Sequence, residues 1–289
     1  MIPLSVVIAA RNAEQTIREQ IIALTSQQWP NGGEIIVADN GSTDSTVQIV
    51  LEEILQLDPD GNVSVHIVNC GEVPGAGHAR NAGVRVSRFP HVAFCDADDI
   101  VTDGWIEAMG SALTDHPAVG GRLALDQLNP KEVRDSRGSS LDGSSLPTFD
   151  GVFPVLSSCN FGMDRATFET LGGFDESYLR GQDAELSLRM HERGITVHFA
   201  PDAVVQYRLA NSSTSIFRQA QGWGQVNDRL RARLPERPRL TASLRSWLWL
   251  GAHLHHLADP ERRARWVYVA GIRIGLVRGG IRRHLGRSE

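Results

Sequence analysis

The sequence predicts an α/β fold with a mainly parallel open sheet, helices on both faces and a helical C-terminal extension. Over residues 1–120, short β-branched runs alternate with segments of helical periodicity, a pattern typical of βαβ units. The composition, 41% apolar and 22% charged residues, is that of an ordinary globular protein. An arginine-rich segment begins near residue 229, and this change of composition predicts a separate extension.

The first elements follow from local patterns. Residues 4–10 (LSVVIAA) are short, β-branched and apolar, so they predict a buried strand. We expect Asn12 to cap the next helix with Gln15 as its capping-box partner, because this pair precedes an apolar stripe that starts at Ile17. The same patterns predict strand 34–40, helix 41–57, strand 63–68, helix 78–88, strand 91–95 and helix 104–113.

The pattern weakens in the second half. Residues 129–151 are polar and rich in Ser and Gly, which predicts a loop. Regular structure is expected again at 152–156, in helices from about Asp164 and from Asp183 to Gly194, and in strands at 195–199 and 203–209. The tail predicts two helices, the second beginning with Pro260 after Asp259. The apolar face of the first comprises Leu240, Leu244, Trp247, Leu248 and Gly251.

The charge is unevenly distributed. Residues 229–289 contain 14 arginines and four acidic residues, a net charge of +10, whereas the whole chain carries −5 and residues 1–228 therefore −15. An acidic body with no recognition motif argues against a nucleic-acid partner. We expect the two parts of the chain to have different partners.

Cysteine usage and hydropathy indicate the compartment. Cys70, Cys95 and Cys159 are odd in number and lack metal-type spacing, so they predict buried thiols in a reducing compartment. The start of the chain, MIPLSVVIAARN, has no basic region, and no apolar run approaches the roughly 18 residues of a membrane span. We expect a cytoplasmic protein, or one attached peripherally to the inner face of the cell membrane.

Three carboxylates, Asp96, Asp98 and Asp99, directly follow predicted strand 91–95. Like charges repel and a buried carboxylate is costly to ionise, so this cluster predicts a cation. Carboxylate oxygens suit Mg²⁺ or Mn²⁺, which also bind substrate phosphates. The alternative is a solvated acidic turn. Asp39 also ends a predicted strand, and ligands of parallel sheets bind beyond such carboxyl ends.

Three further segments hold candidate functional residues. Asp39 can accept hydrogen bonds from a nucleobase or a ribose hydroxyl, or it can form a turn. Gly77 allows close backbone approach to a ligand, and Arg80 can meet phosphate or base oxygens. Asp183 begins a predicted helix, where it is either an N-cap or, beside an acceptor hydroxyl, a general base.

Six segments in order along residues 3–228 resemble the motifs of the inverting glycosyltransferases of family 2: SVVIAARN, VADNGSTDST, GHARNAG, FCDADDI, GGFDE and GQDAELSLRMHERG. The resemblance implies the GT-A fold, a nucleotide-diphosphate sugar donor, typically a UDP-sugar, Mn²⁺ or Mg²⁺, and a hydroxyl acceptor that is a saccharide, a lipid-linked compound or a small molecule. It also implies a catalytic domain at 1–228, with a nucleotide-sugar half at about 1–120 and an acceptor half at about 121–228, before the extension at 229–289.

The resemblance further implies roles for single residues. Asp183 is the catalytic base, Asp98 coordinates the metal, and Asp96 approaches the ribose or the metal. The residues implied for nucleotide-sugar binding are Ala10, Arg11, Asp39, Gly77, Arg80, Asp96 and Ala97. The residues implied for acceptor contact are Trp105, Phe174 and Gln182. A core-facing position is an equal alternative for Trp105.

Two departures from the family pattern leave rival hypotheses. Gln182 stands where Glu is common, and Gln206 where many members carry a metal-binding His. His198 is expected to be a core histidine and not a substitute ligand. One rival is a catalytically silent sugar-nucleotide binder. The other is a nucleotidyltransferase, which needs a Gly-rich loop with a lysine that AARNAEQ does not provide.

The tail has two interpretations. Trp247, Trp249 and Trp266 among arginines suit a helix that lies on an anionic lipid surface. Packing against the catalytic domain or a dimer partner explains the same residues. His253, His255 and His256 are close in sequence, but we do not expect a metal site there.

Overall fold

The computed structural model describes residues 2–57, 61–137, 143–234 and 241–285. Unit 1 comprises Met1–Ala124 and Asp142–Tyr207, and unit 2 comprises Leu125–Leu141 and Arg208–Glu289. The elements of unit 1 are β1 (Leu4–Ala10), α1 (Ile17–Thr25), β2 (Gly33–Asp39), α2 (Thr46–Ile54), β3 (Val63–Asn69), α3 (Ala76–Val86), β4 (His91–Asp96), β5 (Ile100–Val101), α4 (Trp105–Asp115), β6 (Ala118–Ala124), β7 (Thr148–Phe149), β8 (Phe153–Pro154), β9 (Asn160–Asp164), α6 (Arg165–Leu171), α7 (Gln182–Glu192) and β10 (His198–Gln206). Those of unit 2 are α5 (Lys131–Arg137), α8 (Ser213–Arg231), α9 (Thr241–Ala252), the 3₁₀ helix η1 (Leu254–Leu257) and α10 (Pro260–His284).

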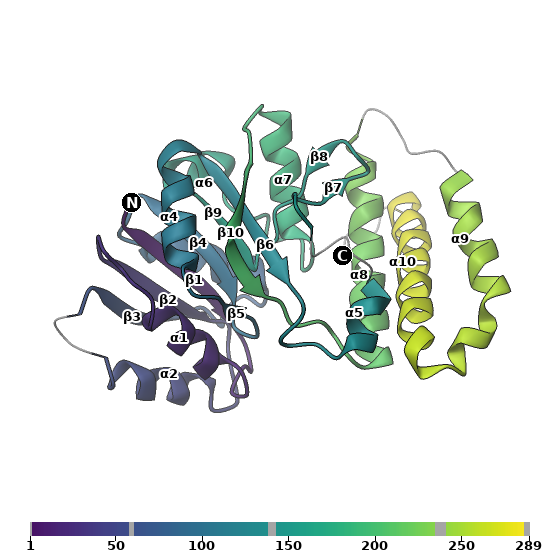
Figure 1. Ribbon diagram of the computed structural model, residues 1–289. Helices are drawn as coiled ribbons and strands as arrows, with labels where there is room; N and C mark the ends of the chain where they lie inside the picture. The colour runs from purple at the N-terminus through teal and green to yellow at the C-terminus, as the bar shows by residue number, and fades with distance from the viewer. Residues whose placement is uncertain (1, 58–60, 138–142, 235–240, 286–289) are drawn as a thin grey trace. The chain divides into compact units, whose positions relative to one another are not determined.

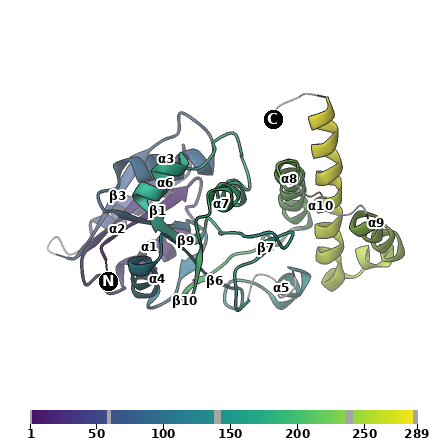
Figure 2. The same cartoon turned by 90° about the horizontal axis from the view of Figure 1, so that it is seen from above.

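Unit 1 is built on a mixed eight-stranded sheet with the order β3-β2-β1-β4-β9-β6-β10-β5 (Figure 1). Strands β3, β2, β1 and β4 are parallel, as are β6 and β10, whereas β9 runs antiparallel to β4 and β6, and β5 antiparallel to β10. Figure 2 shows α1 and α4 on one face of the sheet and α3 and α6 on the other. The predicted mainly parallel sheet with helices on both faces is confirmed.

The core of unit 1 follows from strand alternation. Val7, Ile36 and Phe94 point to the same face, where they pack with residues of α3, α6 and α7 in one buried cluster. Phe94 stacks on Phe161 of the neighbouring strand at a ring-centroid distance of 4.6 Å. Because successive strand residues face opposite sides, the intervening apolar residues are buried against the other helical layer.

Asn12 does not cap α1, which corrects one prediction. Thr16 is the N-cap residue, and α1 begins at Ile17. Asn12 instead adopts the left-handed conformation with φ of 52°, and its Oδ1 accepts a hydrogen bond from the backbone N–H of Thr43 at 2.8 Å. The side chain therefore ties together the loops that follow β1 and β2.

Four other elements differ from the predictions. The predicted loop at 129–151 contains α5, and residues 195–209 hold one strand, β10, with a register shift between Ala200 and Val204. Strand β9 was not predicted because it is short and contains a glycine, Gly162. In the structure this position has little room for a side chain, since a Cβ atom would lie 2.8 Å from Leu113 Cδ1. Helix α8 was not predicted either, since two glycines and many polar residues interrupt its apolar pattern.

Unit 2 is a group of helices centred on α8 and α10, which lie side by side (Figures 1 and 2). Glycines allow their close approach: a Cβ on Gly224 would lie 2.9 Å from the Cα of Gly275, and one on Gly271 would lie 2.7 Å from the Cβ of Ala220. Arg283 pairs with Asp228 at 2.8 Å near one end of the interface. The predicted helical C-terminal segment is confirmed, with Leu240 lying outside the described residues.

Helix α8 is continuous across the predicted start of the extension at residue 229, and the two units meet in sequence at Tyr207 and Arg208. Unit 2 also takes in α5 from the middle of the chain. Within the described ranges, each helix is too short or too polar to cross a bilayer.

Candidate active site

The candidate site begins at the carboxyl ends of three parallel strands. Ala10, the last residue of β1, lies beside Asp39, the last residue of β2, and Ala9 lies beside Asp96, the last residue of β4. Parallel pairing places these ends at one edge of the sheet. The structure thus brings together Ala10, Asp39 and Asp96, which the sequence predicted as parts of one site.

Asp39 lies among loops that hydrogen bonds hold in place. Its side chain is 5% exposed, and its two carboxylate oxygens accept the backbone N–H of Ser42 at 3.3 and 3.2 Å. The adjacent Asn40 donates to the carbonyls of Cys70 and Val73 and accepts the N–H of Gly75 at 2.7 Å. Arg11 is exposed next to this group. The loops after β1, β2 and β3 are therefore held together by side-chain hydrogen bonds.

Arg80 of α3 lies at the centre of the site. Its side chain is 3% exposed, and Nη2 donates to Oδ1 of Asp96 in an ion pair. Burial lowers the pKa of Arg80, but the charge and hydrogen bond of Asp96 and the charge of Asp183 raise it above its ordinary value. Its Nε and Nη1 atoms are buried and find no hydrogen-bond partner within the described part of the chain. Two nitrogen atoms of the guanidinium, Nε and Nη1, therefore carry N–H groups that no described protein acceptor binds.

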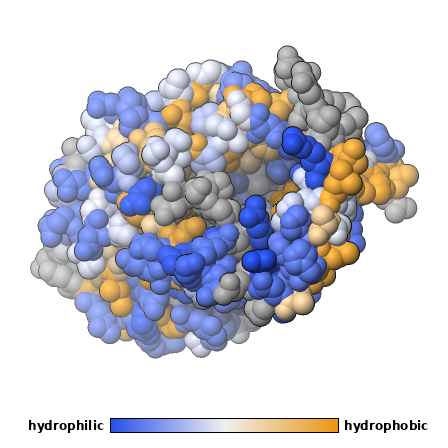
Figure 3. Space-filling model, turned by 45° about the vertical axis from the view of Figure 1, so that its right-hand side comes forward, coloured by the Kyte–Doolittle hydropathy of each residue, from blue (hydrophilic) through white to orange (hydrophobic). Residues whose placement is uncertain are grey.

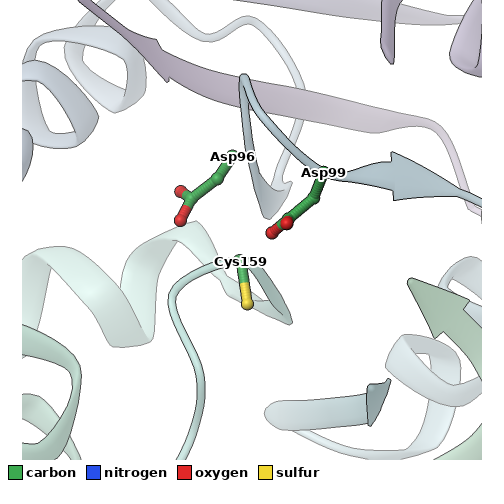
Figure 4. A group of neighbouring side chains, drawn as sticks. All are labelled: Asp96, Asp99 and Cys159. Atoms are coloured by element: carbon green, nitrogen blue, oxygen red, sulfur yellow. The ribbon is translucent and has the colours of Figure 1, made fainter. Parts of the chain in front are cut away.

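A group able to hold a cation comprises Asp96, Asp99 and Cys159 (Figure 4). Their ligand atoms lie within 4.8 Å of one another. Asp96 ends β4, Asp99 lies in the turn before β5, and Cys159 directly precedes β9. Burial, followed by the charges of Asp99, Asp96 and Asp183, raises the pKa of the Cys159 thiol well above its ordinary value, so the sulfur carries its proton at neutral pH.

The three side chains Asp96, Asp99 and Cys159 are only partly suited to a hard divalent cation. Two carboxylates are the oxygen ligands that Mg²⁺ and Mn²⁺ prefer, whereas a protonated thiol is a poor ligand for either. Asp99 is 1% exposed, and a cation on it alone would be enclosed by protein. Asp98, predicted as the metal ligand, is exposed and lies outside this group. Its charge is nevertheless felt at Tyr207, whose pKa is raised mainly by burial and further by Cys159 and the three aspartates.

Asp183 lies in the first turn of α7 but does not cap it. The N-cap residue is Gly181, which adopts φ of 66°, so the N-cap alternative for Asp183 is wrong. The partly exposed Asp183 carboxylate accepts the N–H of Ser158 at 3.1 Å and that of Ala184 at 2.8 Å. Because its charge raises the pKa values of Arg80 and Cys159, it belongs to the same electrostatic cluster.

The structure places two predicted acceptor contacts in the core. Trp105 is fully buried, and its Nε1 donates to Oδ1 of Asn160 at 2.8 Å. Phe174 is 2% exposed and packs edge-on against Phe94. Neither ring presents a surface to an acceptor, which corrects the prediction for both. The core-facing alternative for Trp105 is the one observed.

The remaining residues singled out in the sequence lie in different surroundings. Gln182 is 5% exposed at the start of α7, and a Cβ on Gly77 would lie 3.8 Å from its Cγ. Ala97 is also buried, next to Asp96. His198, expected in the core, is exposed and stacks on His116 at a ring-centroid distance of 3.9 Å. Gln206 is 4% exposed at the end of β10.

Ion pairs of the buried His78 with two more exposed glutamates connect separate segments beside the site. His78 on α3 contacts Glu176 through Nδ1 at 2.8 Å and Glu72 through Nε2 at 3.1 Å. Asn81, on the same helix, donates to the carbonyl of Phe174 and to Glu176. The hydrogen bond that His78 donates to Glu176 is the largest effect on the pKa of His78 and raises it, and the hydrogen bond to Glu72 raises it further. The loop after β3 is thereby fixed to the segment that leads into α7.

Sequence reasoning missed two members of the site. Cys159 was expected only as a buried thiol, because the strand that follows it was not predicted. Asp99 was noted among the three acids but received no role. The closely spaced carboxylates were the available signal for Asp99, and no local pattern pointed to Cys159.

The family model for "Glycosyl transferase family 2" matches residues 5–172, more than half of the chain. The chain belongs to glycosyl transferase family 2. This family 2 member is 27% identical over 203 residues to Glycosyltransferase AglE of Haloferax volcanii, a match that covers 69% of this chain and 65% of AglE. The chain thus spans just under two thirds of that relative's length.

Solved structures share the fold of this family 2 chain. It is similar to the mannosyltransferase PcManGT from Pyrobaculum calidifontis in complex with GDP-Man and Mn²⁺, with a TM-score of 0.67 at 18% identity over 96% of this chain and 86% of that chain. It is also similar to S. aureus TarS 1-349 in complex with UDP-GlcNAc, with a TM-score of 0.56 at 15% identity over 96% and 92% of the two chains. The predicted family and GT-A fold are confirmed.

Proposed function

We propose that this chain is a metal-dependent, inverting glycosyltransferase that moves a sugar from a nucleotide-diphosphate donor, a UDP-sugar, to a hydroxyl acceptor. The observation that carries the proposal is the cluster of Asp96, Asp99 and Asp183 around the buried Arg80 cation, at the carboxyl ends of parallel strands. Membership of family 2 and the complexes of the similar structures with GDP-Man, Mn²⁺ and UDP-GlcNAc support it.

The donor would bind along the strand ends. Asp39, held near the exposed Arg11, is suited to accept hydrogen bonds from the base. The Nε and Nη1 donors of Arg80 are suited to a phosphate or sugar oxygen, since a buried N–H group without an acceptor is costly. The residues proposed for the donor are Ala10, Arg11, Asp39, Gly77, Arg80, Asp96 and Ala97.

We assign the Mn²⁺ or Mg²⁺ contact on the diphosphate side to Asp98, with Asp96 beside it. The exposed Asp98 carboxylate can reach a cation that a diphosphate also binds, whereas Asp99 is enclosed. The bound cation would act as a Lewis acid that stabilises the charge of the leaving diphosphate. In this assignment Asp99 and Cys159 are buried neighbours of Asp96 and do not contact the metal ion.

Asp183 is the proposed catalytic base. Two backbone N–H donors, from Ser158 and Ala184, hold its carboxylate in place. It would take the proton of the acceptor hydroxyl as that oxygen bonds to the anomeric carbon. The bond from this carbon to the phosphate oxygen breaks, and its electron pair leaves with the nucleoside diphosphate. A single displacement of this kind inverts the anomeric configuration.

The test of the base is UDP release from UDP-sugars in the presence of Mn²⁺. Asp183→Asn should lower turnover by about 10²–10⁴-fold while donor affinity persists, because removing general-base catalysis costs that much. Asp202→Asn, at an exposed position on β10, is the matched control. A silent sugar-nucleotide binder, the rival suggested by Gln182 and Gln206, would be stabilised by UDP without releasing product from any donor.

The test of the metal contact compares Asp98→Ala with Asp103→Ala, a nearby exposed aspartate. Asp98→Ala should abolish the dependence of UDP binding on Mn²⁺, measured by thermal shift with and without the ion. Unchanged Mn²⁺-dependent affinity in Asp98→Ala would move the metal contact to Asp96 and Asp99.

The acceptor class within this proposal is a hydroxyl compound, and Gln182 is the remaining candidate contact at the start of α7. A lipid-linked acceptor would place the enzyme at a membrane surface on the cytoplasmic side. Products identified by mass spectrometry from mixed saccharide and lipid-linked acceptors distinguish the classes.

A further inference from the structure

Helix α9 and η1 form an apolar outer surface in unit 2. Its exposed residues are Leu244 at 63%, Trp247 at 41%, Leu248 at 65%, Leu254 at 58% and Leu257 at 39%. We call these five residues the α9–η1 face. Hydrophobic side chains also gather toward the right-hand edge of the surface in Figure 3. An exposed apolar surface of this density marks an interaction site in a globular protein.

The face is held in shape by contacts on the opposite side of α9. Leu250 is buried, and its carbonyl accepts a hydrogen bond from Nε1 of Trp266 on α10 at 3.0 Å. Trp249 stacks on His253 at 4.6 Å, and the guanidinium of Arg265 lies 5.7 Å from the centre of the Trp249 ring. The helix therefore already uses one side to pack on α10. Leu244, Trp247 and Leu248 form a second, exposed apolar side of α9, and Leu254 and Leu257 continue it along η1.

The charged residues within the segment that carries the face have one sign. Residues 241–258, TASLRSWLWLGAHLHHLA, contain no acidic residue, and Arg245 is exposed among the leucines. The first acid, Asp259, is paired with Arg262 at 3.2 Å. Two copies of this face would bring like charges together, so its charge complements an anionic partner.

We propose that the α9–η1 face docks on the surface of an anionic phospholipid bilayer. Apolar side chains with a tryptophan beside arginines are the chemistry of helices that lie at a membrane interface. A 12-residue helix is about 18 Å long, well short of the roughly 30 Å hydrocarbon core, so α9 would lie on the bilayer. The inference is independent of the transfer reaction, because it rests on unit 2 alone.

The experiment measures partition of the full chain into vesicles by co-sedimentation, without donor or acceptor. Vesicles of equal parts phosphatidylcholine and phosphatidylglycerol are compared with pure phosphatidylcholine. Strong binding is expected only to the anionic vesicles. Raising the ionic strength from about 0.1 M to about 1 M shortens the Debye length from about 10 Å to about 3 Å and should weaken it.

Matched variants test the surface itself. Leu248→Asp should lower the partition coefficient by about tenfold or more, because it removes an apolar side chain that the bilayer would cover and adds a charge that the anionic lipid repels. Leu55→Asp, at an 86% exposed leucine at the end of α2, should leave it unchanged. Arg245→Glu is a second variant on the face, and far-UV circular dichroism confirms that each variant is folded. The fluorescence of Trp247 should shift to the blue on binding, a change that Trp247→Phe removes.

Three results would overturn the proposal. The first is the absence of partition into the anionic vesicles. The second is equal loss of binding in Leu248→Asp and Leu55→Asp. The third is reversible self-association of the wild type that Leu248→Asp abolishes without any vesicle binding, since a second copy of the chain would then cover the face.

Discussion

Replacing Gly275 by alanine would introduce a methyl group into the contact between α8 and α10. The added Cβ would overlap the carbonyl oxygen of Gln221 and lie 2.9 Å from the Cα of Gly224. Carbon atoms in contact are normally about 3.5–4.0 Å apart, so the helices must separate by about 0.6 Å or more. Both clashing atoms belong to helix backbone and cannot rotate away. The substitution therefore loosens the whole interface.

The matched control is Gly280→Ala on the same helix, where the added Cβ would meet only Asp228 Oδ1 at 3.9 Å. Alanine is favoured over glycine inside a helix by about 1 kcal/mol, so Gly280→Ala should stabilise the protein by up to that amount. Gly275→Ala gains the same helix propensity of about 1 kcal/mol, but overpacking destabilises a protein by about 1–3 kcal/mol. Because the clash here is with backbone atoms, we take about 3 kcal/mol, which leaves a net loss of stability of about 2 kcal/mol.

Thermal unfolding of the full chain measures both effects. At about 2–4 °C per kcal/mol, Gly275→Ala should lower Tm by several degrees and Gly280→Ala should raise it slightly. Equal stabilisation by both variants would mean that α8 and α10 do not touch at Gly275, and the assignment of the interface would be wrong.

Three further predictions concern unit 1. The pKa of His78 is raised in the folded state, so its ion pairs stabilise the fold fully below the unfolded pKa and lose this effect as pH rises through the folded value. The loss of stability in His78→Gln should therefore be largest below about pH 6.5, the ordinary pKa of histidine, and should shrink as the pH is raised above it. Trp105→Phe should cost about 1–3 kcal/mol in chemical unfolding by leaving Asn160 Oδ1 unpaired, and weaker acceptor binding without loss of stability would contradict the core position. Asp96→Asn should cost about 3 kcal/mol because it leaves the buried Arg80 cation without its partner, and addition of Arg80→Met should recover part of that loss; a further loss would show that Arg80 stabilises the fold by other contacts.

The parallel strands could be predicted because their signal is local. A β-branched run such as LSVVIAA has one favoured conformation, and the alternation with helices restricts the topology of the sheet. That predicted Asp39 and Asp96 at the same edge of the sheet, and in the structure β1 lies between the two strands that they end. Strand β9 carries a weaker local signal, and its antiparallel position between β4 and β6 depends on Gly162 fitting against α4.

The chemistry of the candidate site could be predicted only in part. The sequence identified Asp183 and Arg80, but the ion pair of Arg80 with Asp96 depends on how α3 packs on the sheet. Trp105 and Phe174 were expected near an acceptor, but aromatic residues occur both in hydrophobic cores and at ligand-binding sites. Their burial depends on which neighbours cover them, and residue type carries no information on that.

The sequence by itself determined the order of the elements in the parallel half, the family, and the acidic residues at the strand ends, since each depends on neighbours along the chain. The tertiary structure alone decided that Cys159 lies beside Asp99, that Asp98 is exposed, and that glycines join α8 to α10. The physical reason is that periodicity fixes which side of an element is apolar, whereas long-range packing fixes what covers that side and which charges lose contact with water.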